Sequence, residues 1–500
     1  MTKKQMKLGM FLRPAGHHVA AWRHPDAQVD AGWNFSRFAQ LAQTAERGFF
    51  DMLFLADTSG VPSDDMENAR HTAYVAWIEP FTMMTALSSI TRNIGLVCTS
   101  STSFENPFGL ARKFASLDLV SGGRAGWNLI TSANPLEWRN FGAQPQGSPH
   151  QRYARAREFA GVVQGLWDSW DDDAFVLDKQ SGIFFDPAKL HVLGHEGEHF
   201  QVCGPLNVSR SPQGQPVLVQ AGASEDGRNL AAETADVIFA AATTLEIARD
   251  FYADVKARVA RFGRNPDHVL IMPGFQVMLG QTEQEARDRF EALQNLIHPT
   301  VGVRHLSHYI AFELSGYPID GPLPDIPLRN LNVSRTEMLF KLARRENLTI
   351  RQLYQRIAGG RGHFQTFGTP WQVADMMEEW VTTGACDGFN YMAPIFPSQL
   401  DEFVATVIPE LQRRGLYRAC YEAGTLRGNL GIPRRESRYV SAASGQTWLI
   451  AVGRPQGGDS IPPPERGRYD RGAAPLRSYA IALPPGAGGG DNPIIFPPTS

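Results

Sequence analysis

The sequence contains few cysteines, and none of them is placed to suggest a disulfide framework. Cys98, Cys203, Cys386 and Cys420 lie far apart, and no C-x-x-C pair is present. Scattered single thiols are typical of a protein that stays in a reducing compartment. We therefore expect a cytoplasmic protein.

Long hydrophobic runs and a strong charge imbalance are also missing. No apolar run approaches the roughly 18 residues that a membrane span needs. The basic start MTKKQMK is followed only by LGMFL and then Arg13-Pro14, which is too short for the core of a signal peptide. A formal net charge of −3 over 500 residues provides neither a basic footprint for nucleic acid nor a polybasic patch for a membrane. We expect neither kind of partner.

Two common nucleotide fingerprints are absent as well. No G-x-G-x-x-G follows a strand, and no G-x-x-x-x-G-K-[ST] occurs. A tightly held dinucleotide is therefore disfavoured, and a mononucleotide cofactor fits better. No Ser-His-Asp or Cys-His constellation suggests a strong protein nucleophile.

One motif that is present, HEGEH at residues 195–199, formally matches the zinc pattern H-E-x-x-H. That pattern binds zinc only on a helix, where histidines four residues apart share a face. Gly194 and Gly197 interrupt the segment, Pro205 follows closely, and HFQVCG reads as a strand. We expect no helix here and no metal site.

Eight short apolar runs alternate with amphipathic, helix-like stretches. Alternation of strand and helix predicts a parallel sheet, and eight strands favour a closed (β/α)₈ TIM barrel over an open doubly wound sheet. The predicted strands lie within 7–12, 50–57, 93–100, 121–132, 216–222, 236–242, 269–279 and 386–394.

Two long insertions and an unusual C-terminal segment complete the organisation. The insertions cover 171–215 before strand five and roughly 296–368 before strand eight. Residues 441–500 contain ten glycines and ten prolines, lack periodicity, and cannot bury much surface. We predict a barrel domain over 1–440 and a disordered tail over 441–500.

Polar side chains recur at the carboxyl ends of the predicted strands. Asp57, Thr99 and Thr131 end strands two, three and four, and Asn128 makes the fourth strand half polar. Each could alone be a turn or cap residue. Because catalytic groups of such barrels lie at this end, we expect a shared site there. Ser224 follows strand five and precedes a helix, where backbone N–H groups and a hydroxyl form an anion site suited to phosphate.

Six segments together resemble one family. They are FLADTSG, SGGRAGWNLITS, GPLNVSRSPQGQPVLVQAGASEDGR, GTPWQVADMMEEW, DGFNYM and TLRGNLGIPR. In order and spacing they resemble the bacterial-luciferase-like flavin monooxygenases, in the branch of nitrilotriacetate monooxygenase component A and dibenzothiophene sulfone monooxygenase. The resemblance covers residues 6 to about 439.

The resemblance implies a barrel that takes reduced FMN (FMNH2) from a separate NAD(P)H-dependent flavin reductase. With O2 it would oxidise a small organic substrate next to nitrogen or sulfur, leading to C–N or C–S cleavage. The cofactor would supply the chemistry, while the protein positions it and excludes water. We also expect a homo-oligomer.

The resemblance also assigns residues to the cofactor. Asp57 and Thr99 would lie along the flavin rings, Asn128 under them, and Ser224 at the phosphate. His150 and Tyr153 in SPHQRYARAREF resemble the family's His…Arg-Tyr element, with a spacing one residue shorter than usual. Tyr153 could instead simply pack on the barrel. Asn128 and His150 are the only candidates for a catalytic role.

Several alternatives stay open at this point. The barrel could carry a deazaflavin-dependent oxidoreductase, or a non-catalytic flavin-binding protein, and HEGEH alone would suggest a zinc hydrolase. His17-His18 in the loop after strand one could contact substrate or lie in a solvated loop. Substrate identity depends on loops and insertions, which fold analogy does not fix.

Overall fold

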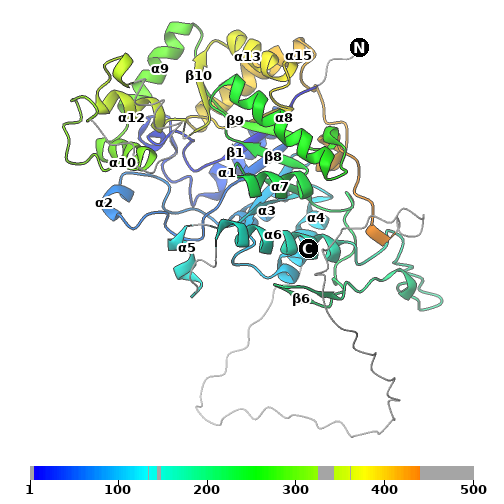
Figure 1. Ribbon diagram of the computed structural model, residues 1–500. Coiled ribbons are helices and arrows are strands. Elements are labelled where there is room, and N and C mark those ends of the chain that lie inside the picture. The colour runs from blue at the N-terminus through cyan, green and yellow to red at the C-terminus, as the bar shows by residue number, and fades with distance from the viewer. Residues whose placement is uncertain (1–4, 133, 143–147, 325–342, 361, 440–500) are drawn as a thin grey trace, which may run out of the picture. The chain divides into compact units, whose positions relative to one another are not determined.

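Eight parallel strands close into a barrel in the computed structural model, which describes residues 5–132, 134–142, 148–324, 343–360 and 362–439 (Figure 1). Around the barrel the order is β1-β2-β3-β4-β7-β8-β9-β11, and β11 pairs with β1. All eight predicted strands are confirmed, and so is the TIM barrel. Their bounds are β1 (Lys7–Leu12), β2 (Met52–Leu55), β3 (Gly95–Ser101), β4 (Ala125–Ile130), β7 (Val217–Gln220), β8 (Val237–Ala240), β9 (Leu270–Leu279) and β11 (Gly388–Tyr391).

Helices cover the outside of the strands, as α6, α7 and α8 show in Figure 1. Local signals set their ends: Asn106 caps α4 ahead of Pro107, and Gly48 ends α1. The longer helices are α1 (Phe35–Arg47), α3 (Pro80–Ser88), α4 (Pro107–Ser121), α6 (Pro149–Trp167), α7 (Glu225–Thr234), α8 (Leu245–Arg261), α9 (Glu283–Asn295) and α13 (Pro370–Thr382). The shorter ones are α2 (Met66–Ala69), α5 (Pro135–Asn140), α14 (Ser398–Glu402), a π-helical turn (Phe403–Val407), α15 (Ile408–Arg413), α16 (Leu426–Asn429) and 3₁₀ turns at Ala21–Arg23, Pro187–Lys189 and Pro266–His268.

Alternation along β4 explains why this strand is half polar. Trp127 is fully buried on the outer face, between Phe114 of α4 and Phe159 of α6. Gly126 and Asn128 alternate with it and so point to the barrel interior. The apolar half of the strand packs under the helices, and the polar half is available to a site inside the barrel.

The chain between α6 and β7 contains the short hairpin of β5 (His195–Glu196) and β6 (Gln201–Val202). The HEGEH segment is therefore not helical, as predicted, because the Gly197 N–H donates to the Phe200 carbonyl and reverses the chain. His195 Nε2 instead lies 3.0 Å from Glu158 Oε1 on α6. In the described part of the chain, no group of three or more His, Cys, Asp or Glu is arranged to hold a metal ion.

The chain between α9 and β11 adds α10 (Pro299–Ile310), α12 (Ile350–Ala358) and β10 (Phe364–Gly368). The two helices have a hydrophobic cluster of their own, which includes Leu306, Ile310, Leu353 and Tyr354. β10 extends the sheet as a ninth parallel strand beside the second half of β9. The sequence did not predict this strand.

The last described segment closes the amino-terminal end of the barrel. Leu426 of α16 packs against Gly95 and Gly126, early positions of β3 and β4, and a Cβ on Gly95 would come within 2.4 Å of the Leu426 side chain. Its neighbour Arg427 forms a buried ion pair with Asp236 at 2.7 Å. The TLRGNLG motif is thus a plug at the end opposite the strand carboxyl ends.

No helix among the described residues is long and apolar enough to cross a membrane. The predicted tail, 441–500, lies outside the described residues.

Candidate functional site

Thr99 and Asn128 form the centre of the candidate site. They are register partners on β3 and β4, and both are buried. The Asn128 amide donates to the Thr99 hydroxyl at 2.8 Å. The other half of the amide, Oδ1, is buried and accepts no hydrogen bond. Because a buried polar atom is nearly always paired, this carbonyl is free to accept a hydrogen bond from a molecule in the barrel interior.

Asp57 lies directly after β2, beside this pair of strands. Its carboxylate accepts a hydrogen bond from the Trp77 indole at 2.9 Å. Burial raises the pKa of Asp57, although the Trp77 hydrogen bond opposes that rise. Nearby, the buried Glu137 accepts from both the hydroxyl of Thr58 and the backbone N–H of Ser59, each at 2.8 Å. These contacts fix the loop that presents Asp57, and the sequence did not single out Trp77 or Glu137.

Ser224 and Tyr153 meet at the start of α7. Ser224 caps this helix by accepting from the Gly227 N–H at 3.2 Å, and its hydroxyl lies 3.5 Å from the Tyr153 hydroxyl. A Cβ on Gly222 would come within 2.9 Å of Gly227, so the two backbones approach as closely as glycine allows. The result is a helix start with closely approaching backbone and two hydroxyls. The first N–H groups of a helix have no partner within it, so this is a suitable place for a phosphate.

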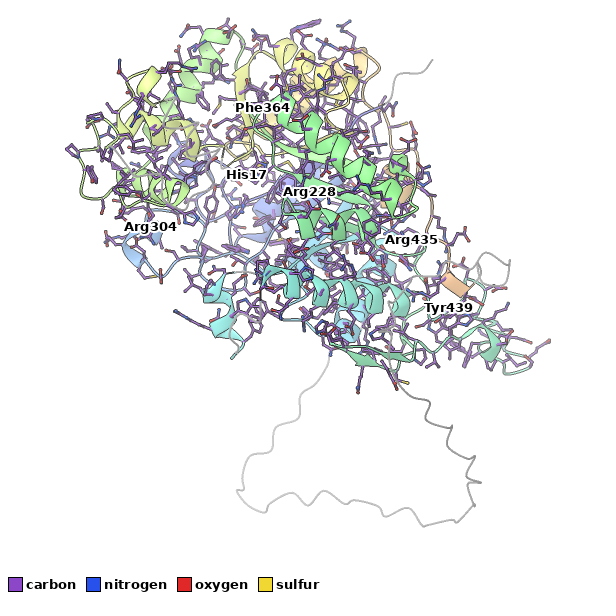
Figure 2. All side chains as sticks on the ribbon, in the orientation of Figure 1. His17, Arg228, Arg304, Phe364, Arg435 and Tyr439 are labelled. Atoms are coloured by element: carbon purple, nitrogen blue, oxygen red, sulfur yellow. The ribbon has the colours of Figure 1, made fainter. Side chains whose placement is uncertain are left out.

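The first turn of α7 also carries two carboxylates, and each has a cationic or imidazole partner. Glu225 binds Arg258 at 2.6 Å, and Asp226 lies 3.2 Å from His150 Nδ1. Arg228, one turn further along the helix (Figure 2), binds Asp254 at 2.7 Å. His150 is thus brought to the predicted phosphate corner, but its exposed ring contacts Asp226 rather than Ser224.

Aromatic rings fill the barrel interior next to these polar groups. Phe11, Phe54 and Phe239 contact one another with ring centroids 4.9–5.5 Å apart. His363, which precedes β10, stacks on Phe239 at 5.1 Å. The interior is therefore apolar and aromatic beside the Thr99–Asn128 pair, a setting suited to a flat ring system. No sequence pattern marked His363, because only the folded insertion brings it here.

The two histidines after β1 are buried, so the solvated-loop alternative for them is wrong. His17 Nε2 lies 2.8 Å from the Phe11 carbonyl, and its ring packs edge-on against Phe11. His18 Nε2 lies 3.0 Å from Gln294 Oε1. Burial lowers the pKa of His18 to about 4, and the hydrogen bond that its ring donates to Gln294 offsets only part of that shift.

The predicted residues thus fall into two groups at the carboxyl ends of the strands. Asp57, Thr99 and Asn128 lie at the ends of β2, β3 and β4, and Tyr153, Ser224 and His150 gather at the start of α7. The unpaired Asn128 carbonyl offers a polar contact inside the barrel, and the close Gly222–Gly227 approach leaves backbone accessible at the start of α7.

Known proteins are similar to this chain in sequence and in fold. Residues 15–386 match the family model described as luciferase-like monooxygenase. The N-acetyl-S-(2-succino)cysteine monooxygenase of Bacillus subtilis (strain 168) is 50% identical over 441 residues, which cover 88% of this chain and 99% of that protein. Nitrilotriacetate monooxygenase component A of Aminobacter aminovorans is 46% identical over 442 residues, covering 87% and 98%.

A solved riboflavin lyase with modified FMN and riboflavin superimposes with a TM-score of 0.74 at 31% identity, covering 86% of this chain and 96% of the other. The resemblance inferred from the six sequence segments, including its branch, is confirmed. Because the family model spans most of the barrel and the relatives match almost end to end, the chain belongs to the luciferase-like monooxygenase family.

Proposed function

We propose that this protein is the oxygenase of a two-component system. It takes reduced FMN from a separate NAD(P)H-dependent flavin reductase and uses O2 to oxidise a small organic substrate next to nitrogen or sulfur, leading to C–N or C–S cleavage. The observation that carries the proposal is the buried, unpaired carbonyl of Asn128 at the aromatic barrel mouth. We also propose a cytoplasmic location, in keeping with four free cysteines.

The relatives support the flavin, the partner component and the substrate class of this proposal. One is named as a component A, which implies a partner component, and the nitrilotriacetate in its name is an aminopolycarboxylate. Another is named for an S-substituted, N-acetylated cysteine. A solved neighbour contains a modified FMN. Nitrogen- and sulfur-bearing substrates, a flavin and a second component thus recur among similar proteins.

Two groups of residues would hold the cofactor. Ser224, Tyr153 and the backbone at the start of α7 would bind the phosphate. Thr99, Asn128 and Asp57 would lie along the ring system, with His150 near the phosphate corner. Bound reduced FMN supplies the electrons that activate O2 for transfer of one oxygen atom to the substrate.

The protein's own residues then bind and orient the cofactor, and they exclude water from it. The Asn128 carbonyl would accept a hydrogen bond from the flavin and provides no acidic proton, and the Thr99 hydroxyl holds the amide in that orientation. Phe11, Phe54 and Phe239 keep the interior apolar. Water exclusion matters because water beside an activated oxygen species promotes its loss as hydrogen peroxide.

The proposal is tested by oxygen uptake with chemically reduced FMN, across chelators, sulfones and aryl or alkyl sulfur compounds. We expect substrate-dependent oxygen consumption, and no useful oxidation of NADH or NADPH until a flavin reductase is added. Turnover without oxygen on a deazaflavin would overturn the assignment in favour of a dehydrogenase. Peroxide as the sole product across the whole panel would favour a flavin-binding protein without oxygenase activity.

A further inference from the structure

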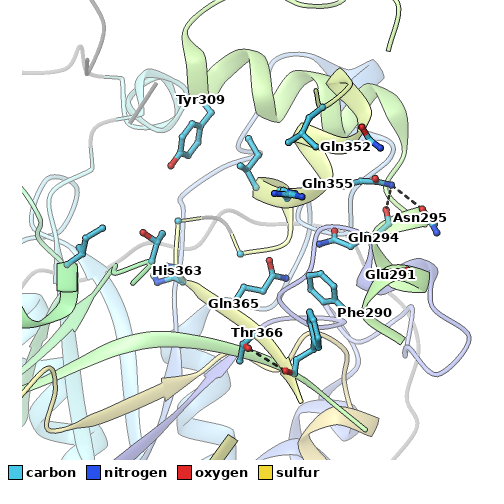
Figure 3. A pocket seen from close by; sticks show the side chains of 18 residues that line it. Phe290, Glu291, Gln294, Asn295, Tyr309, Gln352, Gln355, His363, Gln365 and Thr366 are labelled. Atoms are coloured by element: carbon cyan, nitrogen blue, oxygen red, sulfur yellow. Dashed lines mark hydrogen bonds between the residues drawn. The ribbon is translucent and has the colours of Figure 1, made fainter. Parts of the chain in front are cut away.

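A large cavity lies beside the barrel mouth, and its volume is about 840 Å³ (Figure 3). Residues of α9, α12 and β10 line it, and the amide of Gln365 in its wall donates to Gln276 Oε1 of β9 at 2.7 Å. His363, also in the wall, stacks on Phe239 of the barrel interior. This cavity therefore belongs to the same end of the barrel as the proposed flavin site.

A smaller cavity lies at the opposite, amino-terminal end of the barrel. Its volume is about 210 Å³, and it is formed by the start of β8, the turn between α8 and β9, and the segment that follows α16. None of the residues assigned to the cofactor lines it. Its polar lining residues are Asp236, Arg264, Asn265, His268, Arg427, Arg434, Arg435 and Glu436. Four guanidinium groups thus surround one small space.

One carboxylate, that of Asp236, is shared by three of these arginines. Arg427 donates to both of its oxygens, at 3.0 and 2.7 Å. Arg264 and Arg435 (Figure 2) come only within 3.9 and 4.0 Å of it. Although burial alone would raise the pKa of Asp236, the arginines around it, Arg427 foremost, lower that pKa to about 2. A single carboxylate offsets only one of the three positive charges.

The other contacts of Arg264 leave its charge unmatched. Its terminal nitrogens donate to the backbone carbonyls of Ala232 and Ala235, at 2.9 and 2.7 Å, and these acceptors are neutral. Burial lowers the pKa of Arg264 to about 10, and the charge of Asp236 opposes only part of that shift. Arg264 is therefore a largely buried cation beside a carboxylate that Arg427 already holds.

Arg427 contributes an unused donor to the same cavity. It is 4% exposed, and its Nε has no hydrogen-bond partner, which is costly for a buried N–H group. Arg434 differs from the other three, because Asp172 binds it at 2.6 and 2.9 Å. Glu436, the second acidic residue of the lining, is exposed, so solvent weakens the effect of its charge. The cavity thus combines excess positive charge with a buried donor.

We propose that this cavity binds a small oxyanion, a phosphate or a carboxylate, between the guanidinium groups of Arg264, Arg427 and Arg435. Guanidinium forks match the oxygens of both anions. The volume of about 210 Å³ is below the range of roughly 300–1,000 Å³ typical of pockets for drug-sized ligands, so the ion is small. The bound anion supplies negative charge that Asp236 alone does not, and it joins the segment after α16 to the end of the barrel. The site does not depend on the proposed function.

The test titrates inorganic phosphate into the full-length protein by isothermal titration calorimetry, at an ionic strength held constant with sodium chloride. Excess FMN is present, so that the proposed phosphate corner at the start of α7 is occupied. We expect saturable binding of one phosphate per chain and a rise in Tm with phosphate concentration. Malonate, titrated in the same way, distinguishes a carboxylate ligand from a phosphate. Saturable binding of neither anion would overturn the proposal.

Variants then locate the anion. Arg435→Gln and Arg264→Gln each remove one guanidinium and should weaken binding about tenfold or more. Arg249→Gln, the same change at an exposed position of α8, should leave it unchanged. Cooperative thermal unfolding of each variant serves as the check of folding, and Arg435, the more exposed of the two, is the safer substitution.

Two further results would overturn the proposal. One is anion binding that is unchanged in both the Arg435 and the Arg264 variant. The other is anion binding that disappears in Ser224→Ala but persists in Arg435→Gln, because it would place the anion at the start of α7. Failure of the proposed function has a different signature, since the anion titration involves neither reduced flavin nor oxygen.

Discussion

The side-chain amide of Asn128 donates to the hydroxyl of Thr99 at 2.8 Å and leaves its carbonyl oxygen buried without a partner. The two residues come from neighbouring strands and share one register position. This pairing fixes which end of the amide faces the barrel interior. The carbonyl, an acceptor, is thereby presented to the space where we place the flavin ring.

Replacing Asn128 by leucine should uncouple oxygen use from product formation. Asn128→Leu keeps the side-chain size but removes the acceptor, so the ring would be held less firmly. With reduced FMN and a productive substrate, we expect the ratio of hydrogen peroxide to product to rise while the protein stays folded. Thr99→Val keeps the Asn128 carbonyl and should have a smaller effect. An unchanged peroxide ratio in Asn128→Leu would show that this carbonyl does not contact the cofactor.

Ser224→Ala should weaken FMN binding more than it slows turnover at saturation. A hydrogen bond to a charged group contributes about 1.5–3 kcal/mol, so roughly tenfold or more in Kd is expected. Ser224 is also the N-cap of α7, and losing a cap costs about 1 kcal/mol of stability. Thr244→Ala removes the corresponding cap of α8 and controls for that loss. If both variants bind FMN like the parent protein, the phosphate lies elsewhere.

The strand pattern could be predicted because each strand buries an apolar face under a helix. Along β4, for instance, Trp127 and Leu129 alternate with Gly126 and Asn128. Trp127 and Leu129 are buried, and this alternation can be read from neighbouring residues in the sequence. The polar strand ends were likewise visible, since parallel strands bring their carboxyl ends to one rim. The assignment of Asp57, Thr99, Asn128, His150, Tyr153 and Ser224 to a flavin stays a prediction.

The pH dependence of stability should contain a contribution from His18. Its pKa is lowered to about 4 by burial, so between pH 6.5 and 4 the unfolded chain binds a proton that the folded protein does not. The free energy of unfolding must therefore fall as the pH falls through this window, by as much as about 3 kcal/mol. His18→Gln should lose less stability between pH 7 and 4.5 than the parent protein in urea unfolding. His308→Gln, on an exposed face of α10, should lose as much stability over this pH range as the parent protein. Parallel curves of unfolding free energy against pH for all three proteins would contradict the expected role of burial.

Shortening the plug residue Leu426 should destabilise the barrel without affecting the cofactor. Leu426 is fully buried against Gly95 and Gly126, and leucine-to-alanine changes in cores cost about 2–5 kcal/mol. We expect Leu426→Ala to lower Tm clearly while the Kd for FMN stays within twofold at a temperature where the variant is folded. Leu119→Ala, at a partly exposed position of α4, should change stability by no more than about 0.5 kcal/mol. A large loss of FMN affinity in Leu426→Ala would show that the two ends of the barrel are coupled.

The residues that the sequence did not reveal come from the insertion and from contacts across the barrel. β10 is short, and its segment FQTFG has mixed polarity, so no run of apolar residues marked it. His363 and the Gln276–Gln365 pair are ordinary polar residues in the linear sequence. Their meaning depends on which strand the insertion returns to, and tertiary packing alone decides that.

Incorporation of labelled oxygen tests the central claim most directly. The protein is mixed with chemically reduced FMN and a substrate that stimulates oxygen uptake, under ¹⁸O₂ in unlabelled water, and the product is analysed by mass spectrometry. We expect one ¹⁸O atom per product molecule, with no product when O2 or reduced FMN is omitted. Product that carries oxygen only from water, or that forms without O2, would contradict it.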